Sequence, residues 1–237
     1  QVALNGMAID ASWEIEGTPV KTIVELSDDA NFATFIDSVV VEDALTHQFT
    51  GLQLSKTYYV RVKQADCANA EWVVSEALST PLAVPVTITF PSTTLSGGWS
   101  RYSGKVDEVL SDAAQLTSTS SGWGLVDGNT KISNIHPRIN VYGTSRNHWF
   151  VSPAIDFSAN AGDSIVLNFD ALLCKYSSSG SVSSAAETTG TDDRFVVLAT
   201  TDNGTTWTKL AEWNNQGTGD YVYNALANDA FSFSLNM

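Results

Sequence analysis

Short segments of alternating apolar and polar residues, separated by turn-forming residues, constrain this chain most. From Met7 to Glu14, apolar side chains such as Ile9 and Trp13 fall on one side and polar ones such as Asp10 on the other. The segment Ile165–Leu172 alternates in the same way. Because successive side chains of a strand point to opposite faces, both segments are predicted to be half-buried strands. Charged residues are only 16% of the chain, so we expect an all-β fold.

The first part of the chain contains further predicted strands separated by turn-forming residues. Strands are predicted at Val20–Leu26, Phe35–Val41 and His47–Leu52, and the polar stretch Ser27–Phe32 supplies turn chemistry between the first two. Strands at this spacing are typical of a β-sandwich.

A family resemblance enters with the segment Gly51–Lys63, in which a tyrosine pair leads into alternating valines. Residues 1–82 resemble a fibronectin type III domain on this pattern. The resemblance implies that Tyr58 forms the tyrosine corner and that Trp13 is the core tryptophan of an early strand. Both are then packing residues, and we expect this domain to be a spacer.

Two prolines, Pro81 and Pro85, stand close together in Thr80–Val86. Proline fixes φ and lacks the N–H that a ladder needs, so a short, stiff connection is expected there. We place the domain boundary after residue 82, giving domains 1–82 and 83–237. A chain of 237 residues is long enough for two cores.

The second domain is predicted to be a larger jelly-roll sandwich. Short strands are expected at Val86–Phe90 and Arg194–Thr200, the latter apolar on both faces. The Ser-rich stretch Ser177–Thr191 is expected to be a mobile loop.

Three segments of this domain, in this order, carry a second resemblance: Thr89–Trp99, Asn147–Phe157 and Asp193–Trp207. They resemble the jelly-roll domains of Bacteroidetes surface proteins called cleaved adhesin or choice-of-anchor J domains, which are similar in shape to MAM and galactose-binding domains. The resemblance implies a surface location and adhesion. Its pattern continues into closing strands beyond Met237, so either the chain is a fragment or the fold closes differently.

The net charge of the chain limits the classes of partner that it can bind. Acidic residues outnumber basic ones 26 to 12, which gives a formal charge of −14 and a pI near 4.3. Phosphate backbones would be repelled, so nucleic-acid binding is excluded. No apolar run approaches the roughly 18 residues of a membrane-spanning helix. The excess of carboxylates leaves calcium open as a ligand, although Thr89, Pro91 and Ser92 replace the acidic residues that the second family often carries near its calcium site.

Metal and catalytic motifs are weak. His47, His136 and His148 lack metal-ligand spacing, and Cys67 and Cys174 are expected to be separate buried thiols. No serine lies in a Gly-x-Ser-x-Gly elbow, so we expect no enzymatic activity.

Two acidic segments contain candidate calcium ligands. Oxygen ligands from Asp192–Asp193 and from the turn at Asp127–Asn129 would suit calcium, but solvated turn residues are the stronger interpretation. Asp192 and Asp193 do not suit a glycosidase acid/base pair, because neighbours on a strand point to opposite faces.

The segment Thr200–Trp207 fits the Asp-box pattern. In it the carboxylate of Asp202 ties a hairpin turn, Gly204 takes a positive φ, and Trp207 covers the hairpin. We expect a turn-stabilising role.

Aromatic residues supply the candidate binding site. Trp99, Tyr102 and Trp123 lie in turn-rich sequence, where flat rings would stack on sugars, whereas Trp149 and Trp213 are better explained by packing. The sequence therefore predicts a non-catalytic, secreted or cell-surface protein of bacteria that binds a glycan or an extracellular protein. The alternative is an accessory carbohydrate-binding region of a larger secreted peptidase or glycoside hydrolase.

Overall fold

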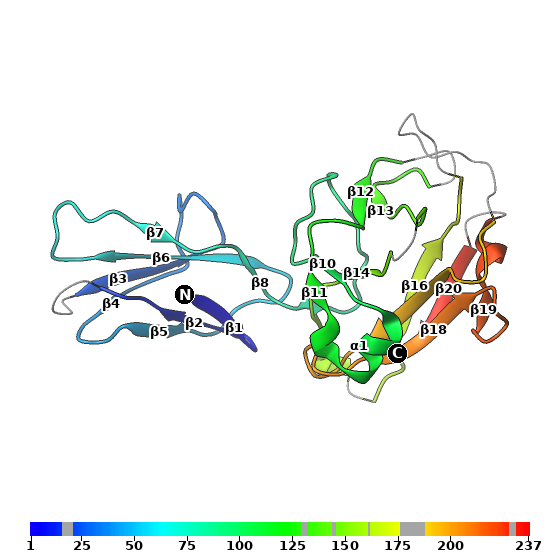
Figure 1. Ribbon diagram of the computed structural model, residues 1–237. Coiled ribbons are helices and arrows are strands. Elements are labelled where there is room, and N and C mark those ends of the chain that lie inside the picture. Colours follow the sequence, from blue (N-terminus) through cyan, green and yellow to red (C-terminus); the bar gives the residue numbers. More distant parts are fainter. Residues whose placement is uncertain (16–20, 129–131, 144–145, 161, 176–187, 228–230) are drawn as a thin grey trace. The chain divides into compact units, whose positions relative to one another are not determined.

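The computed structural model describes residues 1–15, 21–128, 132–143, 146–160, 162–175, 188–227 and 231–237 (Figure 1). The fold is all-β, as predicted. Within the described residues the exceptions are the helix α1 (Val106–Ser111) and short 3-10 helices at Ala113–Gln115, Ser158–Asn160 and Tyr223–Ala227. The chain forms two compact units: residues 1–86 with 153–159, and residues 87–152 with 160–237.

In the part of unit 1 that the structure describes, the antiparallel strands form two sheets. The first has the order β1-β2-β5, and the second has the order β4-β3-β6-β7, with β8 also paired to β6. The strands of this unit are β1 (Val2–Asn5), β2 (Ala8–Ser12), β3 (Thr22–Ser27), β4 (Asp37–Val41), β5 (Thr46–Phe49), β6 (Thr57–Gln64), β7 (Val73–Val74), β8 (Leu78–Ser79), β9 (Leu82–Ala83) and β15 (Ile155–Asp156).

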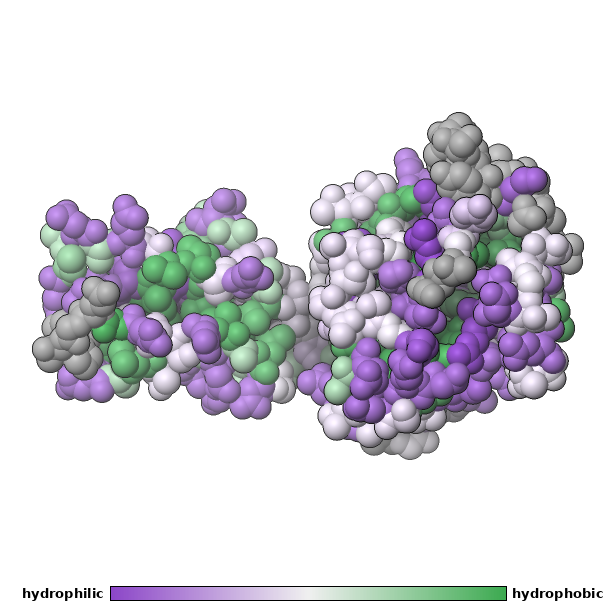
Figure 2. All heavy atoms as spheres, in the orientation of Figure 1, coloured by the Kyte–Doolittle hydropathy of each residue, from purple (hydrophilic) through white to green (hydrophobic). Residues whose placement is uncertain are grey.

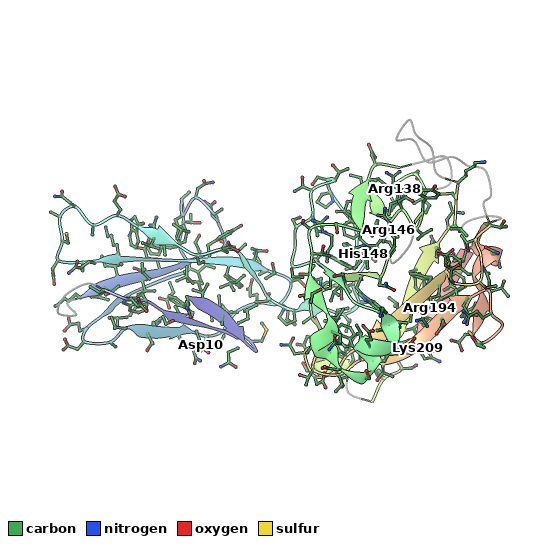
Figure 3. The ribbon with its side chains drawn as sticks, in the orientation of Figure 1. Asp10, Arg138, Arg146, His148, Arg194 and Lys209 are labelled. Atoms are coloured by element: carbon green, nitrogen blue, oxygen red, sulfur yellow. The ribbon has the colours of Figure 1, made fainter. Side chains whose placement is uncertain are left out.

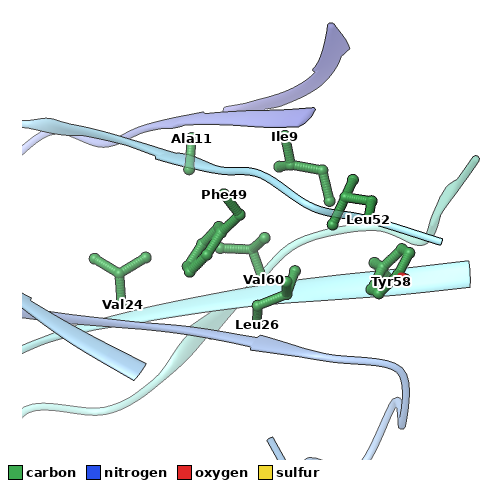
Figure 4. Close-up of a cluster of buried hydrophobic side chains, with 8 residues drawn as sticks. All are labelled: Ile9, Ala11, Val24, Leu26, Phe49, Leu52, Tyr58 and Val60. Atoms are coloured by element: carbon green, nitrogen blue, oxygen red, sulfur yellow. The ribbon is translucent and has the colours of Figure 1, made fainter. Parts of the chain in front are cut away.

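The core of unit 1 lies between these two sheets (Figure 4). Ile9 and Ala11 of β2 are buried there, which confirms the alternation predicted for this segment. The other buried members are Val24, Leu26, Phe49, Leu52, Tyr58 and Val60. Trp13 was expected to be central, but it lies after the end of β2 and packs half-buried against this cluster.

Tyr58 makes the hydrogen bond expected of a tyrosine corner. Its hydroxyl accepts a bond from the backbone N–H of Gln53, at 2.9 Å. The ring is 3% exposed, so the hydroxyl ties the loop before β6 to the core.

The opposite side of β3 and β6 carries a charged and aromatic stack. Arg61 forms a mostly buried ion pair with Glu25, at 2.5 Å, and its guanidinium lies 4.4 Å from the Phe32 ring centre and 4.1 Å from that of Trp72. Lys63 lies 4.6 Å from the Trp72 ring centre. The two rings thus shield a charge that would be costly to bury alone.

A segment remote in sequence completes unit 1. β15 pairs in parallel with β9, and the N–H of Leu82 donates to the carbonyl of Ala154 at 2.8 Å. Unit 1 therefore extends past residue 82, to Val86, and includes residues 153–159. Parallel pairing joins segments that are far apart in the chain, so local sequence pattern gives no sign of it.

The described residues of unit 2 form four small sheets, ordered β11-β10-β14, β12-β13, β16-β20 and β17-β18-β19. Its strands are β10 (Ser100–Ser103), β11 (Thr117–Ser118), β12 (Gly124–Val126), β13 (His136–Arg138), β14 (His148–Val151), β16 (Val166–Ala171), β17 (Arg194–Ala199), β18 (Thr208–Asn214), β19 (Tyr221–Val222) and β20 (Phe231–Asn236).

The main core of unit 2 surrounds Trp213, which is 1% exposed, as expected of a packing residue. Phe169 of β16 and Phe195 of β17 pack against it. Alternate residues of β16 are exposed and half-buried, which confirms the predicted alternation of Ile165–Leu172. β20 pairs with β16 along the whole of both strands.

Unit 2 differs from the sequence predictions in one segment and in one helix. The strand predicted at Val86–Phe90 is wrong: this segment has no regular secondary structure, and the flanking prolines remove N–H groups that a ladder would use. The helix α1 was not predicted, because it is only six residues long and buries only Val106 and Val109. Most of the predicted loop Ser177–Thr191 lies outside the described residues.

Candidate ligand-binding site

Two of the three predicted site residues come together on one face of the sheet β11-β10-β14. β10 and β14 are antiparallel, with Arg101 opposite Phe150 and Tyr102 opposite Trp149. Trp99 immediately precedes β10, two residues before Arg101. Because alternate residues share a face, Trp99, Arg101 and Phe150 lie on the same side of this sheet.

Four aromatic rings gather on that side: Phe90, Trp99, Trp123 and Phe150. We call them the aromatic face. Trp99 stacks on Phe150, with ring centroids 4.5 Å apart and planes at 17°. Trp123 is also tilted against Phe150, with centroids 6.1 Å apart, and Phe90 contacts both Trp99 and Phe150. Phe150 is thus the shared neighbour of both predicted tryptophans.

Hydrogen bonds fix Trp123 to two strands of this sheet, β10 and β14. Its indole Nε1 donates to the carbonyl of His148 in β14, at 3.1 Å. Its own carbonyl accepts a bond from Nη1 of Arg101 in β10, also at 3.1 Å. The preceding residue, Gly122, lies against the His148 ring, where a Cβ atom would come within 2.5 Å of Cγ. The position of Trp123 is therefore set by the sheet and by a residue without a side chain.

All four rings of the aromatic face are half-buried, unlike the fully buried Trp213. They make aromatic contacts with each other and keep part of their surface in solvent. Such a surface combines fixed orientation with access for a ligand, which is what stacking against a sugar ring requires. The view in Figure 2 shows the visible side of unit 2 to be mostly hydrophilic, with small hydrophobic areas between.

Tyr102 is not part of this arrangement. It follows Arg101 directly on β10, so its side chain points to the other side of the sheet, together with Trp149. The prediction that Tyr102 joins Trp99 and Trp123 in one site is therefore wrong. Trp149 anchors the sheet instead, because its Nε1 donates to the carbonyl of Gly104 at 2.7 Å.

The main charged cluster of unit 2 is structural. Arg194 of β17 forms an ion pair with Asp107 of α1 at 3.0 Å, and Lys209 pairs with the buried Glu212 at 2.7 Å (Figure 3). Burial alone would raise the pKa of Glu212, but hydrogen bonds from Lys209 and Asn214 hold it below its usual value. Each charge has an opposite partner, so this cluster secures α1 to the sheet.

The candidate calcium residues do not form a metal centre in the part of the chain described. No three Asp, Glu, His or Cys side chains gather there around one point. The carboxylate of Asp127 accepts a bond from the N–H of Gly128, as a turn residue does, and Asn129 lies outside the described residues. Burial is the main cause that raises the pKa of Asp193, with the neighbouring Asp192 adding to it.

A hollow of about 590 Å³ over the sheet β1-β2-β5 has Asp10, Ser12 and His47 among its lining residues. These residue types invite comparison with a hydrolase triad. However, Asp10 is held by Asn5 and Gln48, and His47 lies opposite the core-facing Ala11 with its ring against Phe49. His47 therefore faces away from Asp10 and Ser12, and this hollow assembles no triad.

The cysteines are separate thiols, as expected, but only Cys174 is partly buried. Burial raises the pKa of the Cys174 thiol, and the charge of Arg138 opposes this. The expectation that Cys67 is buried is wrong: it is exposed, since it lies in the loop after β6 rather than on a strand.

The Asp-box prediction is confirmed in its geometry. Asp202 accepts bonds from the hydroxyl of Thr200 and from both the amide and the hydroxyl of Thr206, at 2.6–2.8 Å. The hydroxyl and amide of Thr206 lower the pKa of Asp202 to about 2. Gly204 has a φ of 86°, and the Trp207 ring lies beside it.

No protein-family model matches the chain, and a search of curated proteins finds no similar sequence. Among the described helices, none has the length and apolar character needed to cross a membrane.

Proposed function

We propose that this chain is a non-catalytic binding protein whose aromatic face holds a glycan. The observation that carries the proposal is the placement of Trp99 and Trp123 around Phe150, half-buried and on one side of one sheet. Sugars present apolar C–H faces that pack on such rings, while their hydroxyl groups bond to nearby polar groups.

The sequence resemblances support the setting of this activity. The two facing sheets of unit 1, β1-β2-β5 and β4-β3-β6-β7, together with the Tyr58 hydrogen bond, suit the fibronectin-like spacer suggested by residues 1–82. The resemblance of unit 2 to bacterial adhesin domains favours a secreted or cell-surface protein of the Bacteroidetes type. As an accessory region of a larger peptidase or glycoside hydrolase, the chain would use the same aromatic face.

An extracellular protein is a second candidate partner, favoured by unit 1. Phe35 and Ile36 are 57% and 54% exposed beside the edge strand β4, and Val73 of the edge strand β7 is 68% exposed. Figure 2 shows hydrophobic residues gathered in the middle of the visible side of this unit. Adjacent exposed apolar residues, such as Phe35 and Ile36, are a feature of protein contact sites.

A thermal-shift screen against neutral and acidic oligosaccharides tests the glycan proposal. A ligand at about 100 times its Kd stabilises the folded state by about 2.7 kcal/mol, which raises the Tm by several degrees. Trp99→Ala and Trp123→Ala should abolish the rise, whereas Trp72→Ala, a tryptophan change in unit 1, should leave it intact. A panel that produces no rise would refute glycan binding and leave the protein partner as the remaining candidate.

A further inference from the structure

Arg101 is a cation at the aromatic face without a carboxylate partner in the described part of the chain. It lies opposite Phe150, and within the described residues its side chain makes one hydrogen bond, from Nη1 to the carbonyl of Trp123. Other cations of unit 2 differ: Lys105 pairs with Glu108, and Arg194 pairs with Asp107. Since a guanidinium has five N–H donors, Arg101 keeps most of its donors for a ligand.

The chain segment around this face is also unlike the rest in charge. Residues 90–150, which include all four rings of the aromatic face, contain five of the 12 basic residues but only four of the 26 acidic ones. This leaves seven basic and 22 acidic residues elsewhere. Within this segment the carboxylates of Asp107 and Glu108 are already paired with cations. The aromatic face therefore belongs to the one long stretch that does not share the strong negative charge of the chain.

We infer that the glycan held by this face carries an anionic group, a uronate carboxylate or a sulfate ester, which Arg101 binds. The inference rests on the proposed function. A guanidinium fixed beside aromatic rings binds a planar carboxylate through two parallel N–H bonds while the sugar ring packs on Trp99 or Trp123. Long polyanions are disfavoured by the 22 acidic residues outside the segment, so the ligand is a glycan in which acidic sugars are few or spaced by neutral ones.

Matched glycan pairs test this inference by titration calorimetry. The probes are a disaccharide of one galacturonate and one neutral galactose, compared with its methyl ester, and a galactose disaccharide with a single sulfate ester, compared with its desulfated form. We expect one acidic member to bind about 10-fold or more tightly than its neutral counterpart, the effect of one charge-assisted contact. A preference for the carboxylate pair or for the sulfate pair identifies the anion. Equal or tighter binding of the neutral members would overturn the inference and leave glycan binding intact. Binding of none of the probes would overturn both.

Substitutions of Arg101 and changes in salt concentration test whether Arg101 causes the preference for the acidic glycan. Arg101→Gln should bring the acidic member to the affinity of the neutral one, and Arg101→Lys should retain part of the preference. Lys21→Gln is the control, because it changes the net charge equally in an exposed ion pair of unit 1. Since exposed charges are screened by salt, raising the ionic strength should weaken acidic binding of the unmodified protein more than neutral binding. A preference that persists in Arg101→Gln and at high salt would overturn the inference.

Discussion

Trp99 lies almost parallel to Phe150, and the two rings come from different strands or strand ends of one sheet: Trp99 precedes β10, and Phe150 is within β14. The hydrogen-bonded register of β10 and β14 therefore sets the orientation of the indole. A ring held in this way loses little freedom when a sugar packs on it, which favours affinity.

Phe150→Leu should show whether Phe150 positions the indole rings of Trp99 and Trp123 or only stabilises the fold. Leucine keeps the site apolar, so we expect a loss of stability below about 1.5 kcal/mol. Without the flat ring, Trp99 and Trp123 lose their shared neighbour, and glycan affinity should fall several-fold. Titration calorimetry and urea unfolding measure the two effects. Unchanged affinity would show that Phe150 does not position the indoles.

Gly122→Ala should destabilise unit 2 by about 1–3 kcal/mol, because an added Cβ would overlap the His148 ring and the φ of 88° disfavours alanine. Gly217→Ala is the matched control: its φ of 75° is similar, but a Cβ there meets nothing within 4 Å. The difference between the two variants in thermal unfolding isolates the clash with His148. Equal losses would mean that backbone strain alone explains both.

Tyr58→Phe should destabilise unit 1 by about 1–3 kcal/mol, since the N–H of Gln53 loses its partner in a partly buried place. Tyr59→Phe removes a hydroxyl from the next residue of β6, on the other face, and should change stability little. Urea unfolding of both variants measures the contrast. A similar effect of both changes would argue against the corner hydrogen bond as the cause.

Asp202 should make the Asp-box hairpin sensitive to acid. Its pKa is lowered from 3.8 to about 2 by hydrogen bonds from Thr206 and Thr200, so the ionised carboxylate stabilises the fold above about pH 4. That contribution is lost as the pH falls from about 4 to 2. We expect the difference in Tm between the unmodified protein and Asp202→Ala to shrink over this range. A difference that stays constant from pH 7 to pH 2 would contradict the assignment.

Local patterns in the sequence were sufficient where one short segment sets the structure. The alternation in β2 and β16, the bonds of Asp202 and the tyrosine corner at Tyr58 all depend on residues close in the chain. The separation of Trp99 and Tyr102 along the chain could also have been used. Residues an odd number of positions apart on a strand point to opposite faces, so Trp99 and Tyr102, three apart, cannot share one. That signal was missed because Trp99–Ser103 does not alternate in polarity.

Other features depend on contacts between remote segments. The parallel pairing of β9 with β15 and the bond between Arg101 and Trp123 join residues that no local pattern connects. Phe150 was overlooked as part of the candidate site because it lies within a strand-like segment, where an aromatic residue reads as core.

The most direct test of the central claim is an NMR titration that follows the indole N–H signals of the seven tryptophans during addition of a glycan that binds. We predict that the signals of Trp99 and Trp123 shift with the same Kd, while those of the buried Trp213 and of Trp72 in unit 1 stay in place. Trp99→Ala and Trp123→Ala assign the two signals. Shifts confined to other tryptophans, or binding without a shift of Trp99 and Trp123, would contradict the account.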